Sequence, residues 1–404
     1  MTNKSLAALF FGCILTASAA SAQSLLPKPQ SFVAGKGAFS TDAKLKVVNE
    51  VGAEAENIYS KQFTANTADD ARQVVRFTRL DGASSPEAYR LHITKDTLLI
   101  SAASADGFRF AWQTVNQLKQ KNAVMACDVV DAPAFKWRSL MLDVSRHFQP
   151  ISFLKKQIDV MAQYKFNRLH LHLTDAAGWR IEIKRYPRLT EFAAWREGKT
   201  WKEWSKLGCK YMHEGEAGAY GGYYTQDELR DLVSYAAERG ITIVPEIEMP
   251  AHSEEVLTAY PELSCTHEPY RQADFCPGNE ATYAFLENVL TEVMEVFPSY
   301  YIHVGGDEAA KASWPDCPLC RQRMAEEGLT DVNGLQSYLI RRMAAFLRQK
   351  GRRLLGWDEI IDGNLGEETT VMVWRNPEKG REAADHGYDV IMAPGKYCYL
   401  DGYQ

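Results

Sequence analysis

The chain has 404 residues, of which 46% are hydrophobic and 24% charged, so it is long enough for two globular domains and its composition excludes a disordered protein. Its formal net charge is −6, and no stretch concentrates lysine or arginine. This charge pattern argues against nucleic acid or an anionic membrane as a partner.

Residues 1–22 are predicted to be a secretory signal peptide. Lys4 precedes an uncharged, mainly apolar stretch from Ser5 to Ala20, and Ala20-Ser21-Ala22 forms an A-x-A cleavage pattern. A membrane anchor is the alternative, but the run is short and rich in small residues, and no other segment approaches the ~20 apolar residues of a spanning helix. We therefore expect an exported protein, either periplasmic or secreted.

Seven cysteines follow the predicted cleavage site, in a compartment where disulfides form. Cys265 and Cys276 flank a polar loop and are predicted to pair with each other. Cys317 and Cys320 have the CxxC spacing of a redox or zinc motif, but neither a second CxxC nor a His pair lies near them to complete a tetrahedral metal site. A local disulfide or two free thiols is therefore expected at this motif.

Residues 23–133 are predicted to form a small α+β domain. The segments Tyr89–Ile93 and Thr97–Ile100 read as antiparallel strands joined by a short turn. A helix follows from Gly107 to Lys119, and its apolar face consists of Phe108, Ala111, Trp112, Val115 and Leu118. No catalytic constellation is visible in this domain.

Residues 134–404 alternate strands with helices, which is the signature of βα units. Seven strands are predicted: Ser139–Val144, Arg168–Thr174, Ile241–Ile247, Tyr300–Gly305, Arg353–Trp357, Thr370–Trp374 and Asp389–Ala393. The clearest helix runs from Thr225 to Arg239, because Thr225 and Glu228 form a capping box and Gly240 ends it.

Nearly every predicted strand ends in polar or aromatic residues: Asp143 and Arg146, Asp175, Glu246 and Glu248 with His252, Asp307 and Glu308, Trp357-Asp358-Glu359, and Trp374. Catalytic groups on most strand ends are typical of a (β/α)₈ barrel of the TIM type, which is the α/β fold that we predict. A doubly wound sheet is the alternative, but it would concentrate ligand groups at one crevice.

The stretch from Tyr300 to Glu308 combines a short apolar run, two glycines and two adjacent carboxylates. Gly305 and Gly306 let the backbone leave strand geometry, so that Asp307 and Glu308 need not point to opposite faces. Two carboxylates this close resist ionising together, which suits a general acid beside a charged stabiliser. A solvated pair capping the next helix is the alternative, and the strand and glycines argue against it.

The segment His303-Val304-Gly305-Gly306-Asp307-Glu308 resembles the signature of glycoside hydrolase family 20, the β-N-acetylhexosaminidases. Other segments resemble further blocks of that family in the same order: Leu142–Arg146, Leu171–Asp175 with Gly178–Arg180, Pro245–His252, Gly356–Glu359 and Tyr399–Asp401. The first domain is also similar to the amino-terminal α+β module of the family. The resemblance covers essentially the whole mature chain.

This resemblance implies a substrate-assisted, retaining hydrolysis of terminal β-linked N-acetylglucosamine or N-acetylgalactosamine from glycans or chito-oligosaccharides. The acetamido oxygen of the substrate would attack its own anomeric carbon. Glu308 would protonate the leaving oxygen and then activate water. Asp307 would hold the acetamido N–H and balance the developing positive charge. No cofactor and no metal are expected.

The resemblance further implies that Arg146 binds sugar hydroxyls with its fork of donors, and that Asp175 and His252 orient the general acid. Each of these has a structural alternative. Arg146 could neutralise Asp143 or Asp175 in an ion pair, and His252 could be an ordinary histidine at the end of a helix.

Four aromatic and acidic residues late in the chain are implied to complete the substrate-binding site. Trp357 and Trp374 would form walls of an acetamido pocket, although a tryptophan that ends a barrel strand can also serve packing alone. Tyr399 would donate to the acetamido oxygen. Asp401 would contact a substrate hydroxyl or the acetamide.

Two alternative functions are considered. His170-Leu171-His172 places two imidazoles on one strand face, as in metal-dependent amidohydrolases, but that chemistry needs further histidines on later strands. A carbohydrate-binding pseudoenzyme on the same fold is the second, and the presence of Asp307, Glu308 and Tyr399 argues against it.

The end of the sequence departs from the family pattern. Only seven barrel strands precede Gln404, and the family's eighth strand has no counterpart. A missing strand would leave two unpaired edges beside the site. We therefore expect that the barrel is incomplete at its C-terminus, that the sequence is part of a longer protein, and that the 404-residue form is weakly active.

Overall fold

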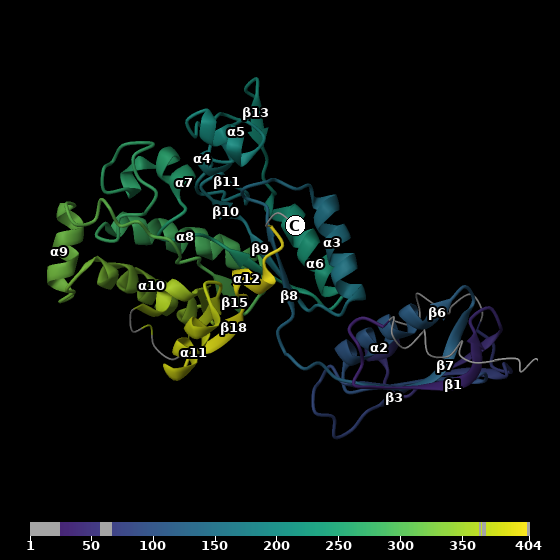
Figure 1. Ribbon diagram of the computed structural model, residues 1–404. Coiled ribbons are helices and arrows are strands. Elements are labelled where there is room, and N and C mark those ends of the chain that lie inside the picture. The colour runs from purple at the N-terminus through teal and green to yellow at the C-terminus, as the bar shows by residue number, and fades with distance from the viewer. Residues whose placement is uncertain (1–24, 57–66, 363–364, 366–368, 402–404) are drawn as a thin grey trace, which may run out of the picture. The chain divides into compact units, whose positions relative to one another are not determined.

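The computed structural model describes residues 25–56, 67–362, 365 and 369–401 (Figure 1). The chain divides into two compact units: the first extends to Lys136 and includes Gln163–Lys165, and the second holds Trp137–Ala162 and the residues from Phe166 onward. The predicted signal peptide, residues 1–22, lies outside the described residues. None of the described helices has the length and apolar character needed to cross a lipid bilayer.

The first unit is a mixed β-sheet with one long helix. Its elements are β1 (Ser31–Ser40), β2 (Leu45–Asn49), β3 (Gln73–Arg79), β4 (Tyr89–Ile93), β5 (Thr97–Ala102), α2 (Ala105–Leu118), β6 (Lys119–Gln120) and β7 (Ala123–Asp131). The strand order is β1-β7-β4-β5-β3-β2, with β6 beside β7. The predicted antiparallel pairing of β4 with β5 is confirmed.

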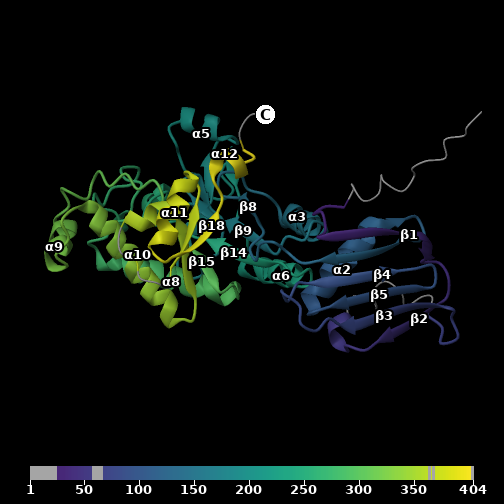
Figure 2. The ribbon, with the colours of Figure 1, turned by 60° about the horizontal axis from the view of Figure 1, so that its bottom comes forward.

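Helix α2 packs on one face of this sheet (Figure 2). The five apolar residues predicted to form its inner face are all buried, and the ring of Phe108 meets the ring of Phe77 on β3 with their centroids 6.0 Å apart. Ser104 caps the helix, because its side chain accepts a hydrogen bond from the backbone N–H of Asp106. The unit thus has its own core, as an α+β domain requires.

The second unit contains the alternating elements. Its strands are β8 (Ser139–Asp143), β9 (Arg168–His172), β10 (Thr174–Asp175), β11 (Gly178–Trp179), β12 (Trp195–Glu197), β13 (Ala219–Gly221), β14 (Thr242–Glu246), β15 (Tyr301–His303), β16 (Arg353–Trp357), β17 (Thr370–Val373) and β18 (Asp389–Met392). Its α-helices are α3 (Ile151–Gln163), α4 (Arg188–Glu191), α5 (Trp201–Lys206), α6 (Gln226–Ala237), α7 (Glu254–Ala259), α8 (Glu280–Val296), α9 (Pro318–Glu326), α10 (Val332–Gln349), α11 (Pro377–Asp385) and α12 (Gly395–Cys398), and its 3₁₀ helices are η2 (Pro261–Leu263) and η3 (Asp358–Asp362).

Seven strands of this unit form one parallel sheet in the order β8-β9-β14-β15-β16-β17-β18. All seven predicted strands are therefore confirmed. The order follows the sequence without reversal, as in a TIM-type barrel, whereas a doubly wound sheet reverses its order at a switch point. Among the described residues β8 and β18 stand at the two ends of this sheet, so the strands do not close into a ring.

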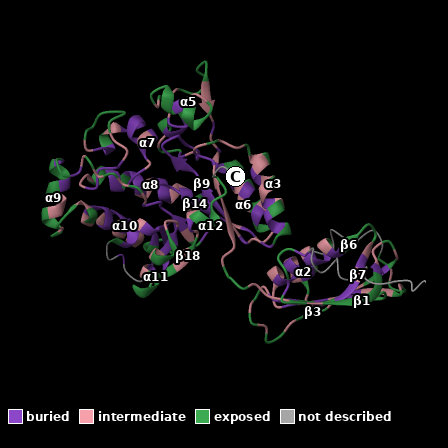
Figure 3. Cartoon of the chain, viewed as in Figure 1, coloured by how far each residue is buried: buried purple, intermediate pink, exposed green. Residues whose placement is uncertain are grey.

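The two faces of the parallel sheet carry different side chains. Apolar residues such as Leu169, Ile243 and Ile302 join the large core beneath the helices, where α6 packs against β14 and α10 against β16. Figure 3 shows these buried strands between helices whose outer faces are exposed. The opposite, inner face carries the alternate residues of the same strands. On that face lie His170, His172, Val244, Glu246, His303, Leu355 and Trp357.

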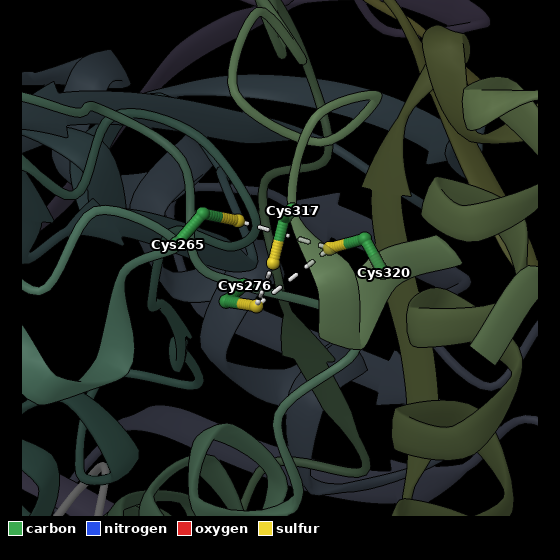
Figure 4. A group of neighbouring side chains, drawn as sticks. All are labelled: Cys265, Cys276, Cys317 and Cys320. Carbon is green, nitrogen blue, oxygen red and sulfur yellow. Dashed lines mark hydrogen bonds between the residues drawn. The ribbon is translucent and has the colours of Figure 1, made fainter. Parts of the chain in front are cut away.

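Four cysteines of the second unit gather in a way that the sequence did not predict. The side chains of Cys265, Cys276, Cys317 and Cys320 point toward one another (Figure 4). The predicted disulfide between Cys265 and Cys276 is wrong, because both thiols are free. The expectation that the CxxC pair lacks further cysteine neighbours is also wrong, because the fold brings two distant loops together.

Candidate active site

Arg146 stands between two aspartates at the carboxyl ends of neighbouring strands. Its Nη1 lies 2.7 Å from Oδ2 of Asp143, and its Nη2 lies 2.7 Å from Oδ2 of Asp175. Burial raises the pKa of Asp143, but the charges of His172 and Arg146 outweigh it and lower that pKa. The ion pairs considered as an alternative role are therefore present. Even so, 38% of the Arg146 side chain remains exposed, which leaves donors free to face a ligand.

Asp175 is fully buried at the end of the short hairpin of β10 and β11. The loop around it is held by Arg180, whose buried guanidinium donates to the backbone carbonyls of Val144, Ser145 and Ala194. These bonds satisfy a buried charge with polar partners from two separate segments. The position of Asp175 is thus set by the hairpin and by Arg180.

His252 links Asp175 to the carboxylate pair after β15. Its Nδ1 lies 3.5 Å from Oδ1 of Asp175, and its Nε2 lies 3.5 Å from Oδ2 of Asp307 and 3.4 Å from Oε2 of Glu308. Burial lowers the pKa of His252, but the nearby carboxylates of Asp175 and Asp307 outweigh it and raise the pKa to about 12. The ring is therefore a cation near neutral pH.

The loss of folding stability caused by replacing His252 with Gln should depend on pH. The folded-state pKa of about 12 lies above the ordinary value of 6.5, so the stabilisation is complete below pH 6.5 and is lost as pH rises toward 12. We expect the difference in melting temperature between wild type and His252→Gln to be larger at pH 6 than at pH 10. His213→Gln serves as the control, because His213 is exposed. A difference in melting temperature between wild type and His252→Gln that grows as pH rises would contradict the raised pKa of His252.

Asp307 and Glu308 follow β15 through the two glycines. Gly305 and Gly306 have φ angles of +66° and +97°, so the backbone leaves strand geometry there, as predicted. Both carboxylates reach the same nitrogen of His252, which places them on one side of the chain. Glu308 itself has φ +49°, an uncommon conformation for a residue with a side chain, and its side chain is 58% exposed against 16% for that of Asp307.

Gly305 is also required by crowding, because a Cβ atom there would lie 1.7 Å from Oε2 of Glu248. We expect Gly305→Ala to lower the free energy of unfolding by about 3 kcal/mol, from the left-handed backbone and the displaced Glu248 together. Gly328→Ala is the matched control, since Gly328 has φ +63° but open space around it. It should cost about 1 kcal/mol in the same denaturant titration. Equal losses in the two variants would show that Glu248 is not displaced.

A second layer of titratable groups lies on the inner face of the sheet. The strand register aligns Glu246 with His172 on β9 and with His303 on β15. The carboxylate of Glu246 lies 2.9 Å from Nε2 of His170 and 2.9 Å from Nδ1 of His303. Burial raises the pKa of Glu246, but the charge on His172 outweighs it and holds this pKa well below the usual range.

The two histidines of β9 do share one face, as the metal-hydrolase alternative assumed. That face is taken by Glu246, and the ring of His172 also lies 3.4 Å from Glu248. Burial lowers the pKa of His172, but the charges of Glu246 and Asp143 outweigh it and raise the pKa well above 6.5. Burial lowers the pKa of His170, so that ring keeps a lone pair, but a protonated His172 has none to offer a metal beside it. This arrangement fits an ion-pair network better than a metal centre held by both histidines.

Trp357 is nearly buried on the inner face, with 4% of its surface exposed. Its indole N–H donates to Oε1 of Glu246 at 2.8 Å, and its ring meets the ring of His303 with centroids 4.8 Å apart. The contacts with Glu246 and His303 therefore hold the indole ring of Trp357 in one position on the inner face of the sheet.

Trp374 and Tyr399 form a more open aromatic pair. Their rings are stacked with centroids 6.5 Å apart and an interplanar angle of 21°. The indole N–H of Trp374 donates to the carboxylate of Glu359, whose pKa is raised by burial to about 7. Asp401 is exposed and close enough to Tyr399 to help, together with burial and Asp307, to raise the pKa of the phenol.

The structure also adds residues that the sequence-based site did not include. His172, Glu246, Glu248 and Glu359 all contact the predicted residues or their neighbours. A pattern in the sequence could have revealed them: polar residues stand at alternate positions in or directly after two buried strands, His170 with His172 and Glu246 with Glu248. Such alternation on a parallel strand marks one face of the sheet, and it indicates a polar cluster on that face.

The chain matches two models of one protein family. The model of the glycosyl hydrolase family 20 catalytic domain matches residues 135–404, and that of domain 2 of the same family matches residues 22–132. A β-hexosaminidase of Porphyromonas gingivalis is 41% identical over 79% of this chain, and one of Vibrio furnissii is 36% identical over 96% of it. The chain spans 41% and 65% of the length of these two relatives.

Solved structures of that family also match. The exo-β-N-acetylglucosaminidase of Vibrio harveyi, in complex with N-acetylglucosamine, superimposes with a TM-score of 0.81 at 32% identity, covering 95% of this chain and 62% of that one. The β-N-acetylhexosaminidase of Bacteroides fragilis gives a TM-score of 0.80 at 34% identity, covering 94% of this chain and 77% of that one.

Proposed function

Since this chain belongs to glycoside hydrolase family 20, we propose that it is an exported β-N-acetylhexosaminidase that removes terminal β-linked N-acetylglucosamine or N-acetylgalactosamine from glycans or chito-oligosaccharides. The observation that carries this proposal is the imidazole of His252, which lies within 3.5 Å of Asp175, Asp307 and Glu308. The His252 imidazolium attracts the carboxylates of Asp307 and Glu308 to its Nε2 atom, while the side chain of Glu308 stays exposed to solvent.

The first chemical step uses the substrate as its own nucleophile. The acetamido carbonyl oxygen bonds to the anomeric carbon as the glycosidic C–O bond breaks, and Glu308 gives its proton to the leaving oxygen. The product of this step is an oxazolinium ion. Asp307 accepts a hydrogen bond from the acetamido N–H, so its negative charge offsets the positive charge that develops on the ring.

The second step returns the enzyme to its starting state. Glu308, now a carboxylate, takes a proton from water as the water oxygen bonds to the anomeric carbon and the oxazolinium ring opens. Two displacements at one carbon restore the β configuration. His252 and Asp175 support both steps, because the imidazolium holds Glu308 in place whichever charge it carries.

The remaining residues would bind the sugar. Arg146 would donate to ring hydroxyls from its exposed edge, since its other donors are held by Asp143 and Asp175. Trp357 and Trp374 would border the acetamido group. Tyr399 would donate to the acetamido oxygen, because its raised pKa keeps the phenol protonated, and Asp401 would accept from a hydroxyl or from the acetamide.

The proposal is tested by the need for an acetamido group. We expect hydrolysis of 4-nitrophenyl N-acetyl-β-glucosaminide and N-acetyl-β-galactosaminide, and kcat/KM at least 10²-fold lower for the matching β-glucoside, since that sugar carries no internal nucleophile. Equal rates on the two classes would contradict substrate assistance. Binding of N-acetylglucosamine without any turnover would identify a binding protein instead.

Export is proposed from the predicted signal peptide alone. Mass spectrometry of the protein from periplasmic and culture fractions should find a mature chain that begins at Gln23. Recovery of only the uncleaved chain from the cytoplasm would contradict export.

A further inference from the structure

The four-cysteine cluster lies outside the proposed active site and has no part in its chemistry. Cys265 and Cys276 belong to the segment between η2 and α8, whereas Cys317 immediately precedes α9 and Cys320 lies in its first turn. Figure 4 shows that the four sulfurs converge on one point from these separate segments. Cys276, Cys317 and Cys320 are buried, and Cys265 is partly exposed.

The spacing of the sulfurs is that of ligands around one ion. Cys276 Sγ lies 3.6 Å from Cys320 Sγ and 3.7 Å from Cys317 Sγ, and Cys265 Sγ lies 3.7 Å from Cys320 Sγ. A zinc ion bound to four sulfurs at about 2.3 Å separates them by about 3.8 Å. A disulfide would need one pair at about 2.05 Å, and here no pair of the four is singled out.

The surroundings fix these positions. A side chain at Gly278 would come within 2.2 Å of the backbone at Leu319 and 2.4 Å of that at Cys320, so the two cysteine-bearing segments pack backbone to backbone. Trp314 and Leu335 enclose the cluster and are fully buried. Such an enclosed site orients its ligands and keeps water from them.

We propose that Cys265, Cys276, Cys317 and Cys320 bind one zinc ion as a structural site. Four thiols lose their protons and form four zinc–sulfur bonds, so no oxidant or reductant is needed. Four protein ligands leave no open position on the metal, which gives the ion a structural role. Soft thiolate donors in a tetrahedral arrangement select zinc over calcium or magnesium.

The location of this site indicates what it stabilises. Cys265 and Cys276 lie in the long βα loop between β14 and α8, which also carries His252 and the short helix α7. Cys317 and Cys320 lie in the long βα loop between β15 and α10, which carries Glu308 and helix α9. The same two loops meet again where the backbone N–H of Lys311 donates to Oδ2 of Asp274 at 2.7 Å. A zinc ion would therefore tie together the two loops that carry His252 and the Asp307–Glu308 pair.

The test is the metal content of the full chain, purified without chelators and measured by plasma mass spectrometry. We expect about one zinc per chain, and at least a tenfold lower content in Cys276→Ser and Cys320→Ser. Cys209→Ser is the matched control, because Cys209 lies outside the cluster, and it should keep its zinc. Wild-type protein that holds less than a tenth of a zinc per chain after incubation with zinc chloride overturns the proposal, even if the variants fail to fold.

Two further readouts distinguish the ligands and the rival states. Cobalt(II) exchanged into the wild type should give the visible absorption of a tetrahedral thiolate site, and the same treatment of Cys320→Ser should weaken it. The intact mass after alkylation without reduction should show that the four thiols react with the alkylating reagent only after zinc has been removed. A chain with two disulfides, four free thiols without metal, or iron in place of zinc overturns the assignment. None of these measurements uses a substrate, so their failure is separate from failure of the proposed hydrolase.

Discussion

Replacement of Glu308 by Gln is expected to lower kcat on N-acetyl-β-glucosaminides by about 10²-fold to 10⁴-fold, the range that general acid–base catalysis supplies. The amide cannot give or take a proton, yet it keeps the shape of the side chain and its place 3.4 Å from His252. Because Glu308 is 58% exposed, its replacement should leave folding unchanged. Steady-state kinetics and melting temperature measured on one preparation separate the two effects.

The loss of activity in Glu308→Gln should also depend on the leaving group of the substrate. A 4-nitrophenolate departs with little help from an acid, so the loss caused by Glu308→Gln should be smaller on that substrate than on chitobiose, whose leaving sugar needs a proton. Glu216→Gln is the matched control, since Glu216 is exposed and lies just before β13, outside the parallel sheet. An equal loss on both substrates, or a loss in the control, would contradict the role of Glu308 as proton donor.

Replacement of Asp175 by Asn is expected to have the largest effect on stability. Asp175 is fully buried between Arg146, at 2.7 Å, and His252, at 3.5 Å. Loss of its charge removes the buried counter-ion that the two cations share, and leaves Arg146 with Asp143 alone and His252 with Asp307 and Glu308. Breaking a buried pair in this way costs about 3 to 5 kcal/mol of unfolding free energy.

Activity should fall with Asp175→Asn as well, since His252 would no longer hold Glu308 in one position. We expect a lower kcat and a pH profile that changes shape, because the contact of the His252 Nδ1 with the Asp175 carboxylate is a main cause of the raised pKa of His252. Asp227→Asn is the matched control: Asp227 is 94% exposed beside Arg230, and its loss should cost less than about 1 kcal/mol. Comparable denaturation midpoints for the two variants would show that Asp175 does not bear on stability.

Much of the fold could be predicted because it depends on neighbours in sequence. The seven strands of the parallel sheet follow from short apolar runs, and helix α6 follows from the capping box of Thr225 and Glu228, which the structure confirms. The tight turn after β15 follows from Gly305 and Gly306, whose φ angles few other residues adopt.

The candidate site could be predicted in part. Placing the strand ends at one edge of a sheet brings Arg146, Asp175, His252 and the Asp307–Glu308 pair together, and the structure has them in one network. How deeply each side chain is buried could not be predicted. Trp357 is buried against Glu246 while Trp374 stays open beside Tyr399, because strand register decides which tryptophan faces the inner network.

The amino-acid sequence by itself determined the family, the order of strands and helices, and the residue types at the strand ends, since these are properties of contiguous segments. Only the tertiary structure decided which other distant side chains meet: that Trp357 donates to Glu246, and that Cys265 and Cys276 join Cys317 and Cys320. The physical reason is that such contacts depend on how loops from different strands pack, and the cysteine pairs approach because Gly278 lets two backbones touch.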